Sequence, residues 1–454
     1  MSSDEENNAI RGASTRVAAL ALIAGTLWAG TLWARMPEVG EPAPSQFGVD
    51  APQLAPLGGH SVGVRTLHLV QHDQIDVLAV DAAGHAPRRD RALTVDLWYP
   101  ARPQPKAPRA TYRATLPSEP PAPPAGFTVP GIAVRDAPAT GSGYPLVVVS
   151  HGYSNDPAAM TWITENLASK GYVVAAIRHG DPPITDRTKY AQPVLRRPLD
   201  IAFVTESLSR ILGGLIDPSR LALIGYSQGG YGVLTAAGAT LDPSGPLTHV
   251  VPAGLLGPYV RGGPLQEAVV TKGVRAVVAI SPAGGGAFAA WGPAGLLGIH
   301  APLLLIAGDH DRTVDYTTGA RAFFDTAVNA QRFLLTFQGA GHSIGLSPAP
   351  AGMRARLWDQ DWFEDPVWRK ERINEIEAHF ITAFLGRYVK DDRAFSSYLD
   401  VPVTESSAGT WPPPAPPPAY DAYSTGAEGV TVWKGFQRKH AEGLEFLQAA
   451  PAAP

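Results

Sequence analysis

One serine in the 454-residue chain is flanked by the small residues that a sharp turn requires. Gly225, Ser227 and Gly229 form the pattern G-x-S-x-G within the segment LALIGYSQGG. The apolar run before Ser227 predicts a strand and the following residues predict a helix, an order that lets the hydroxyl group project from a strained corner. A plain glycine-rich turn is the alternative, but the strand–turn–helix context favours Ser227 as a nucleophile.

Later in the chain, acidic residues and a histidine follow two successive apolar runs, LLLIAGDHDRTV and FLLTFQGAGHSIG. A serine hydroxyl needs a nearby base to act as a nucleophile, and His342 is the candidate. The imidazole in turn needs a carboxylate to hold its tautomer and to stabilise its protonated form. Asp309, Asp311 and Asp315 compete for this role. We favour Asp311 because it lies past the turn at Gly308, whereas Asp309 is expected to stabilise that turn.

The segment LVVVSHGYSND contains a third apolar run that is followed by a loop, called here, like the two above, a strand exit. In this loop, Gly152 would let the backbone approach a substrate closely. The backbone N–H groups of Tyr153 and Gln228 are expected to face the oxyanion of a tetrahedral intermediate. His151 is expected to be structural, because the base should follow the acid along the chain. The spacing of the twelve histidines matches no metal site, so we expect neither a metal nor a cofactor.

These exits require a sheet whose strands end at one edge. Apolar runs that alternate with amphipathic stretches predict an α/β fold, with a mostly parallel central sheet and helices on both faces. Ligands of such sheets bind at the carboxyl ends of the strands, where the three exits would meet. We expect parallel strands at 145–150, 172–177, 221–224, 275–280, 302–307 and 332–337, antiparallel N-terminal edge strands at 65–71, 76–80 and 92–99, and helices at 198–212 and 368–389.

The rest of the chain divides by composition. Residues 17–34 are eighteen consecutive residues without a charge, which predicts a signal peptide or N-terminal membrane anchor over residues 1–35. The protein would then be periplasmic, anchored in the membrane facing the periplasm, or secreted; a buried helix of the folded unit is the alternative. We expect a linker at 36–62, a catalytic domain at 63–400 with a proline-rich excursion over the surface at 102–143, and a proline-rich tail at 401–454.

The overall composition excludes several classes of function. With 45% hydrophobic and 17% charged residues, the chain can bury a sizeable core. Its net charge of −4 provides no basic surface, so we expect no nucleic-acid partner. Cysteine is absent, which excludes disulfides, thiolate metal sites and a cysteine nucleophile.

Together these motifs resemble those of the α/β-hydrolases, in particular the bacterial dienelactone hydrolase-like and platelet-activating-factor acetylhydrolase-like serine esterases. The resemblance covers residues 63–399 and depends on VGVRTLHLV, VDLWYPA, SHGY, GYSQGG, IAGDHDRTV, GAGH and INEIEAHFITAFL. It implies the α/β-hydrolase fold, with Ser227 as nucleophile, Asp311 as acid, His342 as base, and Tyr153 and Gln228 as oxyanion donors. True dienelactone hydrolases use a cysteine nucleophile, so here the resemblance implies ester hydrolysis instead.

The expected function is therefore that of a serine carboxylic-ester hydrolase. It would act through an acyl-enzyme on short to medium acyl esters or lipid-like esters, with a small-molecule ester as its partner and residues 17–34 as a possible membrane attachment. A peptidase or amidase with the same triad, and a non-catalytic binding protein, are the alternatives. Long insertions at 182–197, 251–273 and 343–370 would shape the site. The last carries Trp358, Trp362, Phe363 and Trp368, which could wall a pocket, meet a lipid surface or pack on the sheet.

Overall fold

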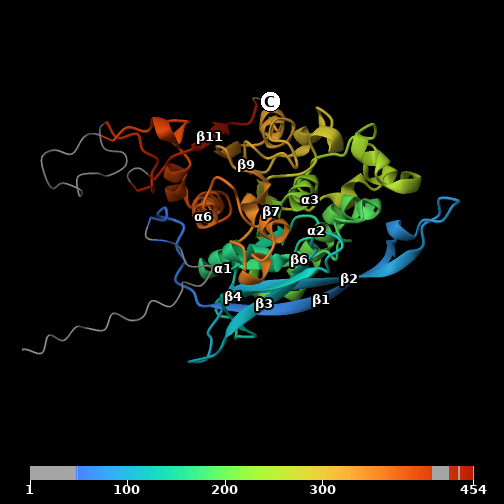
Figure 1. Ribbon diagram of the computed structural model, residues 1–454, viewed down its shortest axis with the longest axis horizontal. Coiled ribbons are helices and arrows are strands. Elements are labelled where there is room, and N and C mark those ends of the chain that lie inside the picture. Colours follow the sequence, from blue (N-terminus) through green and yellow to red (C-terminus); the bar gives the residue numbers. More distant parts are fainter. Residues whose placement is uncertain (1–47, 49, 412–428, 438–439, 453–454) are drawn as a thin grey trace, which may run out of the picture. The chain divides into compact units, whose positions relative to one another are not determined.

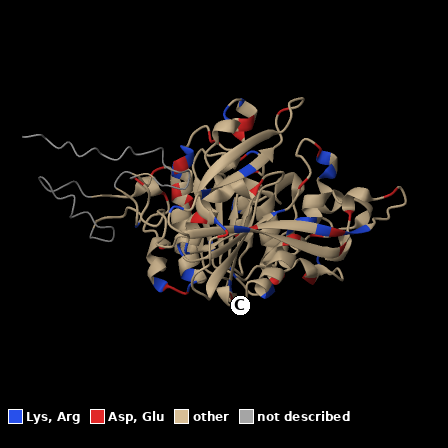
Figure 2. Ribbon diagram, turned by 90° about the horizontal axis from the view of Figure 1, so that it is seen from below, with Lys and Arg blue, Asp and Glu red and all other residues tan. Residues whose placement is uncertain are grey.

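The computed structural model describes residues 48, 50–411, 429–437 and 440–452. The apolar segment at 17–34, predicted to be a leader or an anchor, lies outside these residues. Within the part of the chain that is described, no helix is long and apolar enough to cross a membrane. Figure 2 shows basic and acidic residues interspersed along the ribbon.

Eleven strands of the described residues form one sheet, in the order β11-β10-β9-β8-β7-β5-β6-β2-β1-β4-β3 (Figure 1). Every apolar run that was expected to form a parallel strand does so, which confirms the predicted α/β class with a mostly parallel sheet. The parallel strands are β5 (Tyr144–Ser150), β6 (Val173–Arg178), β7 (Ile216–Tyr226), β8 (Val274–Ile280), β9 (Leu303–Gly308) and β10 (Arg332–Phe337).

The N-terminal side of the sheet contains the predicted antiparallel strands. β1 (Val62–Ile75) pairs with β2 (Arg88–Pro100), and β2 joins the parallel strands through β6. The prediction of a strand at 76–80 is wrong, because a short 3-10 helix forms there, at Val77–Ala79. Its cause is local: the Asp76 carboxylate accepts a hydrogen bond from the Leu78 N–H and stabilises a turn in place of a strand.

The excursion at 102–143, expected to run over the surface, adds two further strands. β4 (Ala125–Arg135) pairs with β1, and β3 (Arg109–Leu116) pairs with β4 as the edge strand. Alternate side chains of β3 are buried, and the Tyr112 hydroxyl donates to the Glu165 carboxylate at 2.6 Å. The many prolines around these strands obscure this alternation in the sequence.

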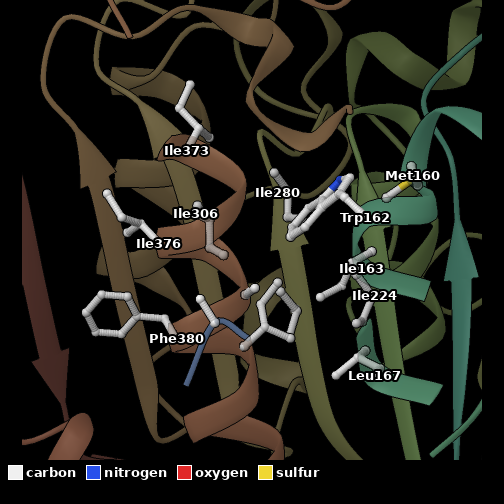
Figure 3. Close-up of a cluster of buried hydrophobic side chains, with 14 of the residues drawn as sticks. Met160, Trp162, Ile163, Leu167, Ile224, Ile280, Ile306, Ile373, Ile376 and Phe380 are labelled. Atoms are coloured by element: carbon white, nitrogen blue, oxygen red, sulfur yellow. The ribbon is translucent and has the colours of Figure 1, made fainter. Parts of the chain in front are cut away.

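Helices cover both faces of the sheet. Successive residues of a strand point to opposite faces, so each strand contributes to two separate apolar cores. Figure 3 shows one of them, in which Ile224, Ile280 and Ile306 of three neighbouring strands meet side chains of α1 and α6. The helices are α1 (Thr161–Ser169) and α6 (Lys370–Tyr388) on this face, α2 (Ala191–Ile211), α3 (Gln228–Ala236) and α4 (Ala322–Thr326) on the other, and the short α5 (Leu357–Asp361).

The segment after residue 400, predicted to be a tail, completes the sheet. β11 (Leu444–Ala449) pairs antiparallel with the full length of β10. Phe446 is buried and stacks on Phe380 of α6, with 4.7 Å between the ring centroids. Ala55, in the predicted linker, is buried as well. Both predicted domain limits were placed by proline content, whereas apolar burial extends the folded unit beyond them at each end.

Candidate active site

Ser227 occupies the sharp turn between β7 and α3. Its backbone has φ +53° and ψ −116°, a strained conformation for a residue with a side chain. The two glycines of the motif make this turn possible. A Cβ atom on Gly225 would lie 2.2 Å from the Gly229 carbonyl oxygen, and one on Gly229 would lie 1.9 Å from the Ser150 carbonyl oxygen. Any larger residue at either position would therefore displace the turn.

His342 and Asp311 complete a hydrogen-bonded chain that ends at Ser227. His342 Nε2 lies 2.9 Å from Ser227 Oγ, and His342 Nδ1 lies 2.7 Å from Asp311 Oδ2. The buried Asp311 also accepts hydrogen bonds from the N–H groups of Thr313 and Val314 at 2.9 and 3.2 Å. Burial opposes ionisation of this carboxyl, but His342 and the two N–H groups outweigh it, so the pKa of Asp311 lies below its ordinary value.

The other two candidate acids make different bonds. Asp309 accepts a hydrogen bond from the Gly339 N–H at 2.6 Å, which ties the turn after β9 to the loop after β10. Asp315 accepts a hydrogen bond from the Thr318 N–H at 2.8 Å. Neither carboxylate is hydrogen-bonded to His342, so the structure brings Asp311 alone of the three to the imidazole.

The loop that carries His342 is held by Asp365 and Lys370, which no sequence motif indicates. The Asp365 carboxylate accepts a hydrogen bond from the Gly341 N–H at 2.7 Å. The buried Lys370 Nζ donates to the carbonyl oxygens of Ser343 and, at 2.5 Å, Ile344. Burial lowers the pKa of Lys370 to about 8. These contacts fix the backbone on both sides of the imidazole.

The tryptophan-rich insertion mainly packs against the rest of the domain. Trp362 Nε1 donates to the Pro117 carbonyl at 3.2 Å, and Trp368 Nε1 donates to the Gln338 carbonyl at 2.8 Å. The Phe363 side chain is also buried. Of the four aromatic residues singled out in this insertion, only Trp358 is exposed, so packing on the sheet accounts for the other three.

The residues expected to bind an oxyanion lie beside the serine. A Cβ atom on Gly152 would lie 3.4 Å from Ser227 Cβ, so the loop before Tyr153 is in close contact with the turn. Within the described residues, no hydrogen-bond acceptor is found for the backbone N–H of Tyr153 or of Gln228. Both N–H groups therefore remain available to a bound group.

Three aromatic rings, called here the aromatic wall, extend from this position. The Tyr153 ring packs edge-on against Tyr190, and Tyr190 against Phe288, with centroid separations of 5.2 and 5.8 Å. The Tyr190 hydroxyl donates to the Gln228 side-chain oxygen at 2.6 Å. The aromatic wall is thereby connected to the residue that directly follows the serine.

His151 has a structural position, as expected. It is buried, and its Nδ1 lies 2.7 Å from the Gly152 carbonyl oxygen while its Nε2 lies 3.4 Å from the His179 backbone nitrogen. Burial and the nearby Arg197 charge hold the pKa of His151 well below its ordinary value. The neutral ring thus donates through Nδ1 and accepts through Nε2, without contact to the serine.

Part of the chain matches a known family. Residues 122–248 match the family model described as PET hydrolase-like (PETase), and this segment contains both the 151–154 loop and Ser227. In the structure, Asp311 and His342 follow later parallel strands than Ser227, which gives the chain order Ser, Asp, His. This chain has the α/β-hydrolase fold.

Part of this chain is similar to several cutinases. Cutinase 2 of Thermobifida cellulosilytica and cutinase cut1 of Thermobifida fusca are each 35% identical to it over 102 residues, which are 22% of this chain and 36% and 30% of theirs. The chain thus spans about a third of the length of these relatives. A ferulic acid esterase structure from Streptomyces cinnamoneus is 20% identical with a TM-score of 0.47, over 76% of this chain and 94% of that one.

These comparisons confirm the resemblance to α/β-hydrolase serine esterases. They point to cutinases and to the PET hydrolase-like family. The finer resemblance to dienelactone hydrolase-like and platelet-activating-factor acetylhydrolase-like enzymes stays a prediction.

Proposed function

We propose that this α/β-hydrolase is a serine carboxylic-ester hydrolase with Ser227, His342 and Asp311 as its catalytic triad. The observation that carries the proposal is the continuous hydrogen-bonded chain from Asp311 through His342 to Ser227, with separations of 2.7 and 2.9 Å. A hydroxyl group, an imidazole and a carboxylate in this geometry form the arrangement that activates a serine nucleophile. The cutinase relatives support an ester as the substrate.

The reaction follows from the position of each group. His342 Nε2 accepts the hydroxyl proton of Ser227 as Oγ attacks the ester carbonyl carbon, and Asp311 stabilises the resulting imidazolium. The negative oxygen of the tetrahedral intermediate accepts hydrogen bonds from the N–H groups of Tyr153 and Gln228. The intermediate expels the alcohol, which takes the proton from His342. His342 then takes a proton from a water molecule that attacks the acyl-enzyme, and it returns this proton to Ser227 Oγ as the acid is released.

The substrates we propose are short to medium acyl esters or lipid-like esters. The aromatic wall begins next to the oxyanion donors and offers apolar surface to an acyl group. The charge-free segment at 17–34 supports an exported or membrane-anchored protein, which would meet its ester substrates outside the cytoplasm.

Covalent labelling tests the proposal. A fluorophosphonate should modify the wild-type protein, and Ser227→Ala should abolish both this labelling and the hydrolysis of p-nitrophenyl butyrate. A p-nitrophenyl ester series of increasing acyl length, compared with the matching anilides, separates esterase from amidase activity. An unlabelled wild-type protein, or equal labelling of Ser227→Ala, would contradict the proposal.

A further inference from the structure

A network of buried charged residues lies directly behind the loop that carries Tyr153. Its centre is Arg197 of α2, whose side chain is fully buried. Arg197 Nη1 donates to the His151 carbonyl oxygen, and Nη2 donates to the Gly152 carbonyl oxygen at 3.1 Å. Both carbonyl groups of the approach to Tyr153 are therefore bound by one guanidinium group, whose fixed fork of donors suits two neighbouring acceptors.

This contact sets the direction of the proposed oxyanion donor. The Gly152 carbonyl and the Tyr153 N–H belong to the same peptide unit, which is planar and trans, so the two groups point in opposite directions. Arg197 holds this carbonyl on its own side, and His151 Nδ1 contacts the same oxygen at 2.7 Å. The N–H must therefore point away from Arg197. The described residues offer no hydrogen-bond acceptor to this Tyr153 N–H.

Asp181 anchors the far end of the same loop. Its Oδ2 atom pairs with Arg197 Nη2 and also accepts a hydrogen bond from the Ser154 N–H at 3.0 Å. The Asp181 side chain is almost fully buried, so its charge is compensated by Arg197 and by this N–H group. One ion pair thus binds the loop before and after Tyr153.

A second hydrogen-bonded set of Ser, His and Asp supports the beginning of the loop. Ser150 Oγ lies 2.9 Å from His179 Nε2, and His179 Nδ1 lies 2.9 Å from Asp200 Oδ2. All three residues are at most 1% exposed, so no substrate could reach this serine. Arg197 Nη1 also donates to Ser150 Oγ at 3.1 Å, which joins this set to the ion pair.

We propose that Arg197, together with Asp181, is a positioning residue that aims the Tyr153 N–H at the oxyanion. The proposal rests on the proposed function, because it assigns Arg197 an effect on the transition state of ester hydrolysis. Arg197 has no hydrogen bond to the Ser227 hydroxyl or to the His342 imidazole. Its removal should therefore weaken stabilisation of the tetrahedral intermediate while leaving the base unchanged.

The test compares Arg197→Met with Arg196→Met. Arg196 is the neighbouring residue and is also buried. It binds Gln71 and Gln74 and approaches Asp200 only at 3.5 Å, and it has no hydrogen bond to residues 151–154. Hydrolysis of p-nitrophenyl butyrate gives kcat, KM and their pH profiles. Inhibition by phenylboronic acid, which forms a tetrahedral adduct with an active-site serine, reports on the oxyanion position independently of turnover.

For Arg197→Met we expect kcat to fall roughly 10²-fold, the scale of a misplaced reacting group or a lost oxyanion donor, with KM within about threefold of wild type. The affinity for phenylboronic acid should fall with kcat, and the pH profile should keep its midpoint. Arg197→Lys should recover part of the loss, since one ammonium group can bind one carbonyl but lacks the fork. Arg196→Met should keep kcat within about twofold.

Asp181→Asn keeps the proposal testable if Arg197→Met does not fold. This variant loses the ion pair but retains an oxygen for the Ser154 N–H, so we expect an intermediate loss of kcat and of boronic-acid affinity. Folded variants at both positions with wild-type kcat would overturn the proposal, as would an equal loss in Arg196→Met. A wild-type protein without fluorophosphonate labelling or esterase activity would instead refute the proposed function.

Discussion

Glu377 of α6 should make the stability of the protein depend on pH. Its side chain is fully buried, its Oε1 atom has no hydrogen-bond partner among the described residues, and its Oε2 atom has only the Asn374 amide at 3.5 Å. Burial raises the pKa of Glu377 to about 8, and the attraction of Lys370 offsets this only in part. The carboxyl group is thus expected to be protonated in the folded protein at neutral pH.

The magnitude follows from the difference between the folded and unfolded states. The pKa of Glu377 rises from 4.5 to about 8, and the difference of about 3.5 units at about 1.4 kcal/mol each corresponds to about 5 kcal/mol. Between these values the folded protein retains a proton that the unfolded chain releases. This contribution to stability is therefore complete below pH 4.5 and is lost as the pH rises through 8.

Glu377→Gln provides the assay, because glutamine resembles the protonated carboxyl group but does not titrate. Urea unfolding at half-unit steps from pH 5 to 9 gives the free energy of unfolding of both proteins. As the pH rises from 5 to 8, the free energy of unfolding of the variant should increase relative to that of wild type by about 1.4 kcal/mol per pH unit. Above pH 8 this difference should level off. A difference that does not change with pH would show that Glu377 is ionised in the folded protein and refute the reasoning.

Two further predictions concern the acid and the C-terminal strand. Asp311→Asn should lower kcat about 10⁴-fold without loss of the fold, because the amide favours the wrong imidazole tautomer. The thermal unfolding midpoint of the variant serves as the control for folding. A near-normal kcat would assign the role of the acid to Asp309 or Asp315. Phe446→Ala should lower the free energy of unfolding by about 3–5 kcal/mol, measured in urea, since it removes a buried ring stacked on Phe380. An effect below about 1 kcal/mol would mean that β11 adds little to the core.

The parallel part of the fold could be predicted because its strands are buried on both faces. Such strands are short continuous apolar runs, and the run at 332–337 matches β10 at both ends. The edge strands β3 and β11 could not be found in this way, since they are half-buried and lie among prolines. β11 pairs with the sequence-distant β10, and β3 joins the sheet only through β4, which pairs with β1. No local pattern therefore indicates that either strand extends the sheet.

The hydrogen-bonded set of the proposed triad could be predicted from the order of its residues along the chain, but the residues that support it could not. Ser227, Asp311 and His342 each follow a strand, and a parallel sheet brings such exits together. Arg197 was missed because the helix was expected to begin at Pro198, a residue favoured in the first turn. Instead, α2 begins at Ala191 and carries Arg197 within its buried length. A charged residue in an otherwise apolar helical stripe was the available signal.

The two loops on which the reaction depends are held in the same way, from opposite faces of the sheet. On one face, Arg197 of α2 binds the carbonyl groups of His151 and Gly152, and on the other, Lys370 of α6 binds those of Ser343 and Ile344. Charge-assisted hydrogen bonds in a buried setting are stronger than those between neutral groups. Each covering helix thus restrains one of the two loops through its carbonyl groups. In the proposed reaction, this leaves the Tyr153 N–H free to bind the oxyanion and the His342 imidazole free to take the serine proton.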